Sequence, residues 1–450
     1  MLEEPGDPFG TAELRGRVLD AWAASPARFR EDANAEEDYA LGGYRDRVVV
    51  ELAQNAADAA ARAGVPGRLL LTLRDGMLTA ANTGAPLDAA GVEALSTLRA
   101  SSKRGPDAAG ESVGRFGVGF AAVVAVSDTP RIRSLTGAVG WSRDRTRELV
   151  RAVPSLGAEL AERAGNVPVL RLPFADGVMA AAALPDGFAT VVELPLRDSA
   201  AAQLVARLLA ETGPALLLAL PALAEVVIET GAGTRVLTAE HAGDAATITA
   251  DGAVSRWRVT AAGGELDPAL LADRPAEERT RTAWSVRWAV PLAGQDIGPE
   301  TGLGLPGDVV SRDQPLGRLP AGVGAVVHAP TPTDEPLGLP ALLLASFPLS
   351  PDRRHVAPGA LTDFLVERAA EGYAGLLPGL VPGPGLLDLV PGPVGRGELD
   401  ARLGRAILAR LPDVAFLPAV SGARVRPRDA LLLGAGCRGS SSGWRRCCLT

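Results

Sequence analysis

Hydrophobic and polar positions along the chain follow two different periods, and these periods predict where helices and strands lie. Apolar residues recur at helical spacing over residues 11–24, 44–63, 88–99 and 361–377. A run of small apolar residues at 119–126 also favours a helix, and another helix is expected soon after Arg197. Gly64 directly follows the second of these segments and is a typical helix stop.

Shorter runs of aliphatic and β-branched residues predict strands. Segments 68–74 and 77–82 flank Asp75-Gly76, the preferred two-residue hairpin turn. Strands are also expected at 168–172, 189–196, 224–230, 246–250, 255–260, 282–290 and 324–330. Helices mixed with an antiparallel or mixed sheet predict an α+β fold for the first part of the chain.

Changes in composition predict three regions. We expect a first domain over residues 1–205 and a second α/β domain over 206–380. Residues 377–397 have the proline and glycine content of a linker, so 381–450 is interpreted as linker, third-domain fragment and disordered tail. That tail holds Cys437, Cys447 and Cys448, whose spacing matches no zinc-site pattern, and we interpret it as a frameshifted or truncated end.

Composition narrows the class of protein. The 450 residues are 47% hydrophobic and 22% charged, which is typical of a globular chain. A net charge of −8 argues against a general binder of nucleic acid or anionic membranes. Neither a signal peptide nor an apolar run of membrane-span length is evident, so a cytoplasmic location is expected. Lys103 is the only lysine and asparagine is scarce, which makes Lys103, Asn55 and Asn82 more informative than usual.

The run ELAQNAADAA at residues 51–60 raises a question about its polar side chains. On a helix, Glu51, Asn55, Asp58 and Arg62 fall within a band of roughly 60°, with small apolar residues opposite. Residues at i and i+4 are neighbours on a helix surface, so Glu51 and Asn55 could contact one ligand. Taken alone, such a band is also typical of the solvated face of an amphipathic helix.

Three further segments are individually weak signals. Asn82 and Gly84 end a predicted strand, where a polar side chain beside glycine could meet a flat ligand or simply form a turn. Glycines at 114, 117 and 119 precede a predicted helix, where free backbone N–H groups could hold an anion. Thr190 lies in a predicted strand, in which threonine is common.

Together, in this order and spacing, the four segments resemble the GHKL ATPases, the superfamily of gyrase, heat-shock chaperones of the ninety-kilodalton class, histidine kinases and MutL. ELAQNAADA resembles the N-box and AANTGAP the adenine box, while SSKRG and VGRFGVGF resemble the two ends of the ATP lid. The resemblance covers about residues 41–197 and is closest to the sacsin and heat-shock chaperone branch. It implies a Bergerat-type two-layer α/β sandwich.

The resemblance also implies a role for each matching residue. Glu51 would orient or deprotonate the attacking water, and Asn55 would bind magnesium. Asp58 would support the nucleotide site, and Lys103 would contact phosphate. The remaining nucleotide-binding positions that the resemblance implies are Asn82, Gly84, Gly114, Arg115, Phe116, Gly117, Val118, Gly119 and Thr190.

We therefore expect slow, magnesium-dependent ATP hydrolysis coupled to lid closure in a chaperone-like protein. Client proteins would be its partners, with a homodimer where a C-terminal dimerisation region exists, and neither nucleic acid nor membrane would bind. One departure concerns Asn82, which stands where the family has aspartate, because an amide can donate as well as accept a hydrogen bond. Two alternatives stay open: a nucleotide-binding switch or scaffold without useful turnover, and a MutL-like ATPase of DNA transactions, against which the acidic charge counts.

Overall fold

The computed structural model describes residues 6–42, 46–96, 119–177, 183–279, 282–293, 317–320, 323–329, 331–350, 354–381, 384–419 and 422–430. The chain divides into two compact units. Unit 1 comprises Met1–Ala239 with Ala250–Gly252, and unit 2 comprises Glu240–Thr249 with Ala253–Thr450. The structure is mixed α and β with a large mixed sheet, which agrees with the expected α+β class at this coarse level. The domain boundaries expected from the sequence stay a prediction.

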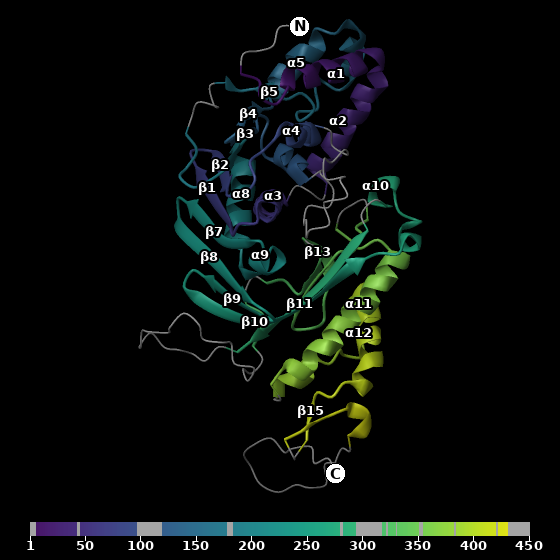
Figure 1. The fold of residues 1–450 in the computed structure, drawn as a ribbon. Coiled ribbons are helices and arrows are strands. Elements are labelled where there is room, and N and C mark those ends of the chain that lie inside the picture. The colour runs from purple at the N-terminus through teal and green to yellow at the C-terminus, as the bar shows by residue number, and fades with distance from the viewer. Residues whose placement is uncertain are drawn as a thin grey trace. The chain divides into compact units, whose positions relative to one another are not determined.

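Unit 1 begins with helices and then alternates helices with strands (Figure 1). Its helices are α1 (Thr11–Ala24), α2 (Pro26–Leu41), α3 (Val48–Ala63), α4 (Ala89–Ser96), α5 (Arg143–Arg151), α6 (Gly157–Glu162), α8 (Ser199–Glu211) and α9 (Pro214–Ala219), with the 3₁₀ helices η2 (Gly119–Ala125) and η3 (Pro154–Leu156). Its strands are β1 (Gly67–Arg74), β2 (Met77–Asn82), β3 (Arg131–Ser134), β4 (Gly137–Gly140), β5 (Phe174–Ala175), β6 (Thr190–Pro195), β7 (Leu223–Thr230) and β8 (Gly233–Ala242), the last of which reaches the boundary between the units.

The strands of unit 1 follow the order β8-β7-β1-β2-β6-β3-β4-β5. Only β1 and β7 pair in parallel among these neighbours, so the sheet is mixed. Helix α3 packs against β1, β2 and β7, and α8 packs beside α3. The neighbouring strands β7, β1 and β2 are therefore covered on the side from which α3 approaches.

Local sequence signals account for several of these elements. The predicted helix at 11–24 and the predicted hairpin are confirmed. Asp75 and Gly76 have φ values of 50° and 71°, the left-handed backbone that a tight hairpin turn requires. Helix α3 ends as expected at Gly64, which adopts φ 64°.

The strand predicted at 168–172 is wrong. These residues form bends and turns, and the first strand after them is β5 at Phe174–Ala175. The backbone N–H groups of Val169 and Leu170 donate to the carboxylate of Glu36 on α2, at 2.5 and 2.9 Å. Because those N–H groups are taken by a side chain, they cannot form a strand ladder.

Helix α2 has no counterpart among the predicted elements. Its sequence is polar around most of its circumference, but Phe29, Ala33 and Glu36 are buried. Ser25 adopts the extended conformation typical of an N-cap, and Pro26 stands at the first turn. Contacts with the rest of unit 1, and not a regular apolar stripe, therefore keep α2 in place.

Unit 2 is built from long strands covered by two helices. Its strands are β9 (Ala245–Ala250), β10 (Ala253–Glu265), β11 (Ala283–Leu292), β12 (Val326–His328), β13 (Pro332–Pro336), β14 (Leu342–Ala345), β15 (Leu417–Pro418) and β16 (Arg424–Val425). Its helices are α10 (Ala276–Arg279), α11 (Ala360–Leu376) and α12 (Glu398–Arg410), with the 3₁₀ helices η4 (Pro268–Leu271), η5 (Leu377–Gly379), η6 (Pro384–Leu389), η7 (Leu411–Asp413) and η8 (Pro427–Asp429). The main sheet has the order β9-β10-β11-β14-β12-β13.

Two buried aromatic residues organise the core of unit 2. The rings of Trp288 on β11 and Tyr373 on α11 lie 4.6 Å apart between centroids, and both side chains are fully buried. Trp288 Nε1 donates to the Ala369 carbonyl, and the Tyr373 hydroxyl donates to the Leu389 carbonyl. Leu386 and Leu389 are buried in the same core, so part of the segment expected as a linker packs against α11.

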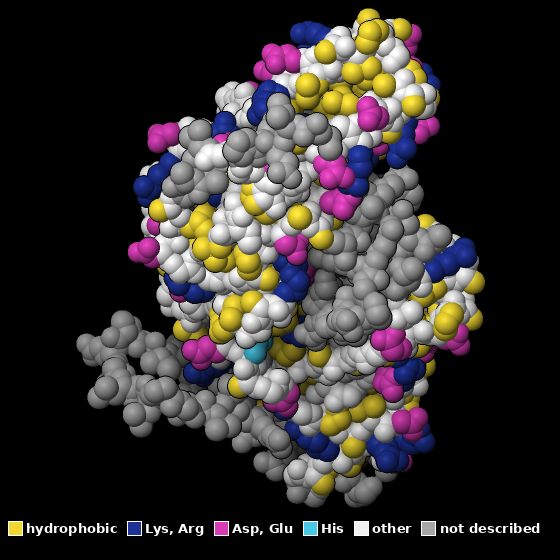
Figure 2. All heavy atoms as spheres, turned by 45° about the horizontal axis from the view of Figure 1, so that its top comes forward, with side chains coloured by type: hydrophobic (Ala, Val, Ile, Leu, Met, Phe, Trp, Pro, Cys, Tyr) yellow, Lys and Arg dark blue, Asp and Glu magenta, His cyan; other side chains and the backbone are white. Residues whose placement is uncertain are grey.

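Basic and acidic side chains are interspersed on one face of the protein (Figure 2). On the face drawn in Figure 2, basic and acidic side chains alternate, and the described residues there form no broad basic patch. Exposed ion pairs such as Arg17–Glu93 and Arg30–Glu159 contribute to this mixture. In the described part of the chain, no helix combines the length and the hydropathy that a membrane span requires.

The buried carboxylate of Glu36 predicts a pH dependence. Burial raises the pKa of Glu36 to about 6, although two backbone N–H groups and Arg171 favour its ionised form. Because the folded-state pKa lies above the unfolded value, protonation favours folding; this contribution is complete below about pH 4.5 and is lost as pH rises through about 6. We expect it to amount to about 2 kcal/mol in the free energy of unfolding.

Urea unfolding of wild type and Glu36→Gln between pH 4.5 and 7.5 measures this dependence. The stability of the wild type relative to the variant should fall by about 2 kcal/mol as pH rises through this range. Glu31→Gln, which changes an exposed carboxylate on the same helix, controls for the substitution itself. Parallel pH profiles for wild type and Glu36→Gln contradict the prediction.

Candidate functional site

The polar band of α3 combines exposed and buried side chains. Asn55 is exposed, Glu51 is half-buried and Asp58 is 3% exposed. The opposite side of the helix is buried and consists largely of alanine. The polar band is therefore not a wholly solvated face, because the side chain of Asp58 lies inside the protein.

A glycine brings the loop after β2 into direct contact with the backbone of α3. A Cβ atom on Gly84 would lie 2.4 Å from the carbonyl carbon of Ala59, and Gly84 itself has φ 110°. The next residue, Ala85, donates its backbone N–H to the Ala59 carbonyl at 2.9 Å. Ala59 directly follows Asp58, so this contact places the predicted adenine-box segment beside the predicted N-box.

The sheet brings Asn82 and Thr190 together. Asn82 on β2 pairs with Thr190 on β6, and Thr190 pairs in turn with Ser134 on β3. Side chains directly opposite each other in a ladder point to the same face of the sheet, so these three form one row. Asn82 is 8% exposed and Thr190 is 9% exposed, which makes this row the more enclosed part of the site.

Hydrogen bonding orients the Asn82 amide. Its Nδ2 donates to the backbone carbonyl of Thr83 at 2.9 Å, which assigns the nitrogen to that side. Among the described residues, no donor lies within hydrogen-bonding distance of Asn82 Oδ1. Asn82 therefore offers a hydrogen-bond acceptor in the place where an aspartate would also offer one.

Gly119 lies against the carboxylate of Glu51. It is the first residue of η2, and a Cβ atom there would lie 2.0 Å from Glu51 Oε2. At the other end of η2, Arg197 Nη2 donates to the Val124 carbonyl and Arg197 Nε donates to Asp128. These bonds fix η2 from its far end, while a side chain at its start would require the Glu51 carboxylate to move.

The other predicted lid residues lie outside the described residues. They are Lys103, Gly114, Arg115, Phe116, Gly117 and Val118. Among the predicted residues, Glu51, Asn55 and Asp58 thus lie on α3, with Gly119 against Glu51 and Gly84 against the neighbouring Ala59. Asn82, the last residue of β2, pairs with Thr190 on β6. Within the described ranges, no three His, Cys, Asp or Glu side chains gather as a ready-made metal site.

Ser134 belongs to the same site but was not predicted from the sequence. Its hydroxyl lies 3.0 Å from Thr190 Oγ1, and it accepts the backbone N–H of Leu87 at 2.9 Å. A lone serine in a short hairpin carries no motif. The only sequence signal would have been the strand alignment of β3 with β6, which depends on tertiary pairing.

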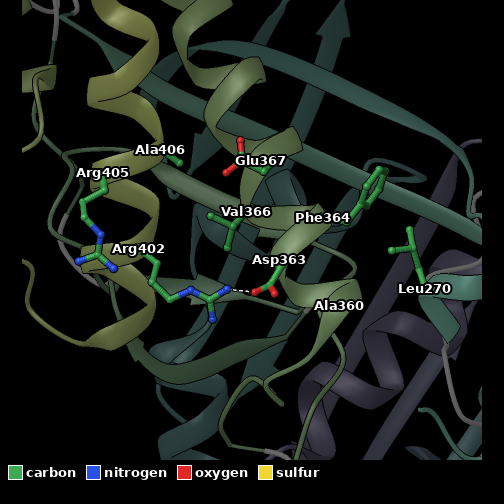
Figure 3. Close-up of a pocket in the computed structure, with 9 residues that line it drawn as sticks. All are labelled: Leu270, Ala360, Asp363, Phe364, Val366, Glu367, Arg402, Arg405 and Ala406. Atoms are coloured by element: carbon green, nitrogen blue, oxygen red, sulfur yellow. Dashed lines mark hydrogen bonds and ion pairs between the residues drawn. The ribbon is translucent and has the colours of Figure 1, made fainter. Parts of the chain in front are cut away.

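A separate hollow of about 640 Å³ lies in unit 2 between α11 and α12 (Figure 3). It is lined by Leu270, Ala360, Asp363, Phe364, Val366, Glu367, Arg402, Arg405 and Ala406. Asp363 forms an ion pair with Arg402, and Glu367 forms one with Arg410. None of the predicted site residues lines this hollow. Of its charged lining residues, Asp363 and Arg402 pair with each other, and Glu367 pairs with Arg410, which lies outside the lining.

Comparison with known proteins adds no family assignment: no family model matches the chain, and no curated protein matches its sequence.

The contact between Gly84 and Ala59 predicts a large effect of substitution. Gly84→Ala should lower the free energy of unfolding by roughly 2–5 kcal/mol, because it adds a clash with helix backbone to the cost of a positive φ. Gly76→Ala is a matched control, since Gly76 also has positive φ but has nothing within 4 Å of the added Cβ. Its expected cost is only about 1–2 kcal/mol. Equal losses in urea unfolding contradict a role for the contact.

Proposed function

We propose that this chain binds ATP with magnesium on the surface formed by α3, the end of β2, β6 and the start of η2, and hydrolyses it slowly as GHKL ATPases do. The observation that supports this most is the approach of Gly119 to Glu51. Two segments that resemble separate motifs of one ATPase site, and that lie far apart in the sequence, are thereby in contact.

The proposal gives each side chain on α3 a task suited to its exposure. Half-buried Glu51 would accept a proton from the attacking water or orient it. Exposed Asn55 would offer one amide oxygen to magnesium, which keeps several waters and needs few protein ligands. Bound magnesium would neutralise charge on the phosphates. Buried Asp58 would support the nucleotide site from within the protein.

The enclosed row on the sheet suits a base. Asn82 Oδ1 would accept a hydrogen bond from the exocyclic amine of adenine, and Gly84 lets the backbone approach closely. Thr190 adds a hydroxyl beside it. The proposal also includes phosphate contacts from Lys103 and from the backbone of residues 114–118. These contacts rest on the sequence resemblance alone.

The sequence resemblance favours a chaperone-like role, in which ATP binding and hydrolysis would change how the protein handles client proteins. The interspersed charge on the face drawn in Figure 2 supports a protein client over DNA, because a DNA-transaction ATPase would be expected to carry a basic footprint. The acidic net charge of −8 points the same way.

Replacing the proposed base tests turnover. Glu51→Gln keeps the size of the side chain and should lower kcat for ATP hydrolysis by about 10²–10⁴-fold, with little change in ATP affinity. Phosphate release measures the rate and calorimetric titration measures the affinity. Equal rates contradict the role of Glu51. Tight binding without turnover by the wild type would indicate a nucleotide switch, and absence of binding overturns the proposal.

Replacing the proposed metal ligand tests the magnesium assignment. Asn55→Ala should weaken ATP binding about tenfold in magnesium and leave binding in excess EDTA unchanged, because only the metal-bridged contact is lost. Arg62→Ala, an exposed change on the same polar band of α3, is the matched control. Binding by Asn55→Ala at wild-type strength in magnesium contradicts the assignment.

A further inference from the structure

Ser134 lies at the end of β3, where three groups surround its hydroxyl. The backbone N–H of Leu87 donates to Ser134 Oγ at 2.9 Å, and Ser134 Oγ donates to the Ala189 carbonyl at 3.0 Å. Thr190 Oγ1 lies 3.0 Å from the same oxygen. Ser134 thus joins the loop before α4 to the first residue of β6.

A count of hydrogens decides the direction of the third bond. A serine hydroxyl has one hydrogen and can accept two bonds. That hydrogen goes to Ala189, whose carbonyl has a second lone pair for the Leu135 N–H at 3.1 Å. Leu87 fills one acceptor position, so the three contacts of Ser134 Oγ are all hydrogen bonds only if Thr190 donates its own hydrogen. The hydroxyl of Thr190 is then left with lone pairs only.

The same polarity holds at the neighbouring position in the row. Asn82 directs its Nδ2 to the Thr83 carbonyl and keeps Oδ1 as an acceptor. Asn82 and Thr190 are directly paired across β2 and β6, so two acceptor oxygens stand side by side on the face toward α3. Two adjacent acceptors favour a ligand group with hydrogens to donate, such as an aromatic amine, and disfavour a carbonyl.

We propose that Ser134 is a positioning residue that holds Thr190 as an acceptor and so makes this site selective for an amino-bearing base over its oxo counterpart. The proposal rests on nucleotide binding at this site. Ser134 contacts no ligand in this scheme, because its three bonds are all to protein groups. Its effect is therefore on the choice of base and not on the hydrolysis step.

The test compares binding of ATP and inosine triphosphate, which differ at the 6-position by an amine and a carbonyl. Ser134→Ala frees the Thr190 hydroxyl to rotate and to donate to that carbonyl. We expect the dissociation constant of inosine triphosphate divided by that of ATP, both measured by calorimetry in magnesium, to fall about tenfold in the variant. Ser134→Thr keeps the hydroxyl and should restore the ratio.

Two further variants separate this role from a structural one. Thr136 also holds Leu87, because its hydroxyl donates to the carbonyl of Leu87, and Thr190 takes no part in this bond. Thr136→Ala should weaken both nucleotides equally and keep their ratio. In a Thr190→Val background, Ser134→Ala should have no further effect on the ratio, because the hydroxyl through which it acts is gone.

Each outcome decides a different statement. If the wild type binds ATP and Ser134→Ala keeps the wild-type ratio, the role of Ser134 is wrong and the proposed function stands. A ratio that falls equally in Thr136→Ala makes Ser134 a loop anchor only, which also overturns the proposal. If the folded wild type binds neither nucleotide, the proposed function fails, and the role of Ser134 in base selection fails with it.

Discussion

The approach of Gly84 to the backbone of Ala59 is the contact on which the candidate site depends. No side chain separates the loop after β2 from α3, so the distance between helix and sheet is set by backbone atoms. Gly67 makes a similar approach, since a Cβ there would lie 2.9 Å from Ala60 Cβ. The alanine-rich composition of α3 follows from this geometry, because larger side chains would push the helix off the sheet.

Arginine side chains fix the ends of several elements around this contact. Arg235 donates to the carbonyls of Leu209, Ala210 and Thr212 at the end of α8, and also to Asp251. Arg171 bonds to Asp32 and to the carbonyl of Ser96 at the end of α4. A guanidinium can reach several acceptors at once in a fixed plane, which a lysine ammonium cannot. Although the chain has a single lysine, its arginines can therefore satisfy the backbone carbonyls at helix ends.

The sequence was most informative where the signal is local. Gly64 and Asp75-Gly76 were assigned correctly because a cap and a tight turn need only their own backbone angles. The strand predicted at 168–172 failed because Glu36, distant in sequence, takes the N–H groups that a neighbouring strand would need. For the site, the polar band of α3 was visible in the sequence, but the burial of Asp58 was not. Ser134 and the contact of Gly119 with Glu51 arise only from tertiary pairing.

The difference in exposure between Asn55 and three buried polar side chains gives the proposed ligand a direction. Asn55 is in solvent, while Asp58, Asn82 and Thr190 are each less than a tenth exposed. A molecule that reaches from Asn55 to these buried side chains would have one end in solvent and one end enclosed by protein. Phosphates carry charge and are costly to desolvate, whereas a base is a flat, largely apolar ring with a few polar edges. Under the proposed function the phosphates therefore lie toward Asn55, and the base lies toward Asn82. Glu51 is then at the phosphate end, which is the end where hydrolysis takes place.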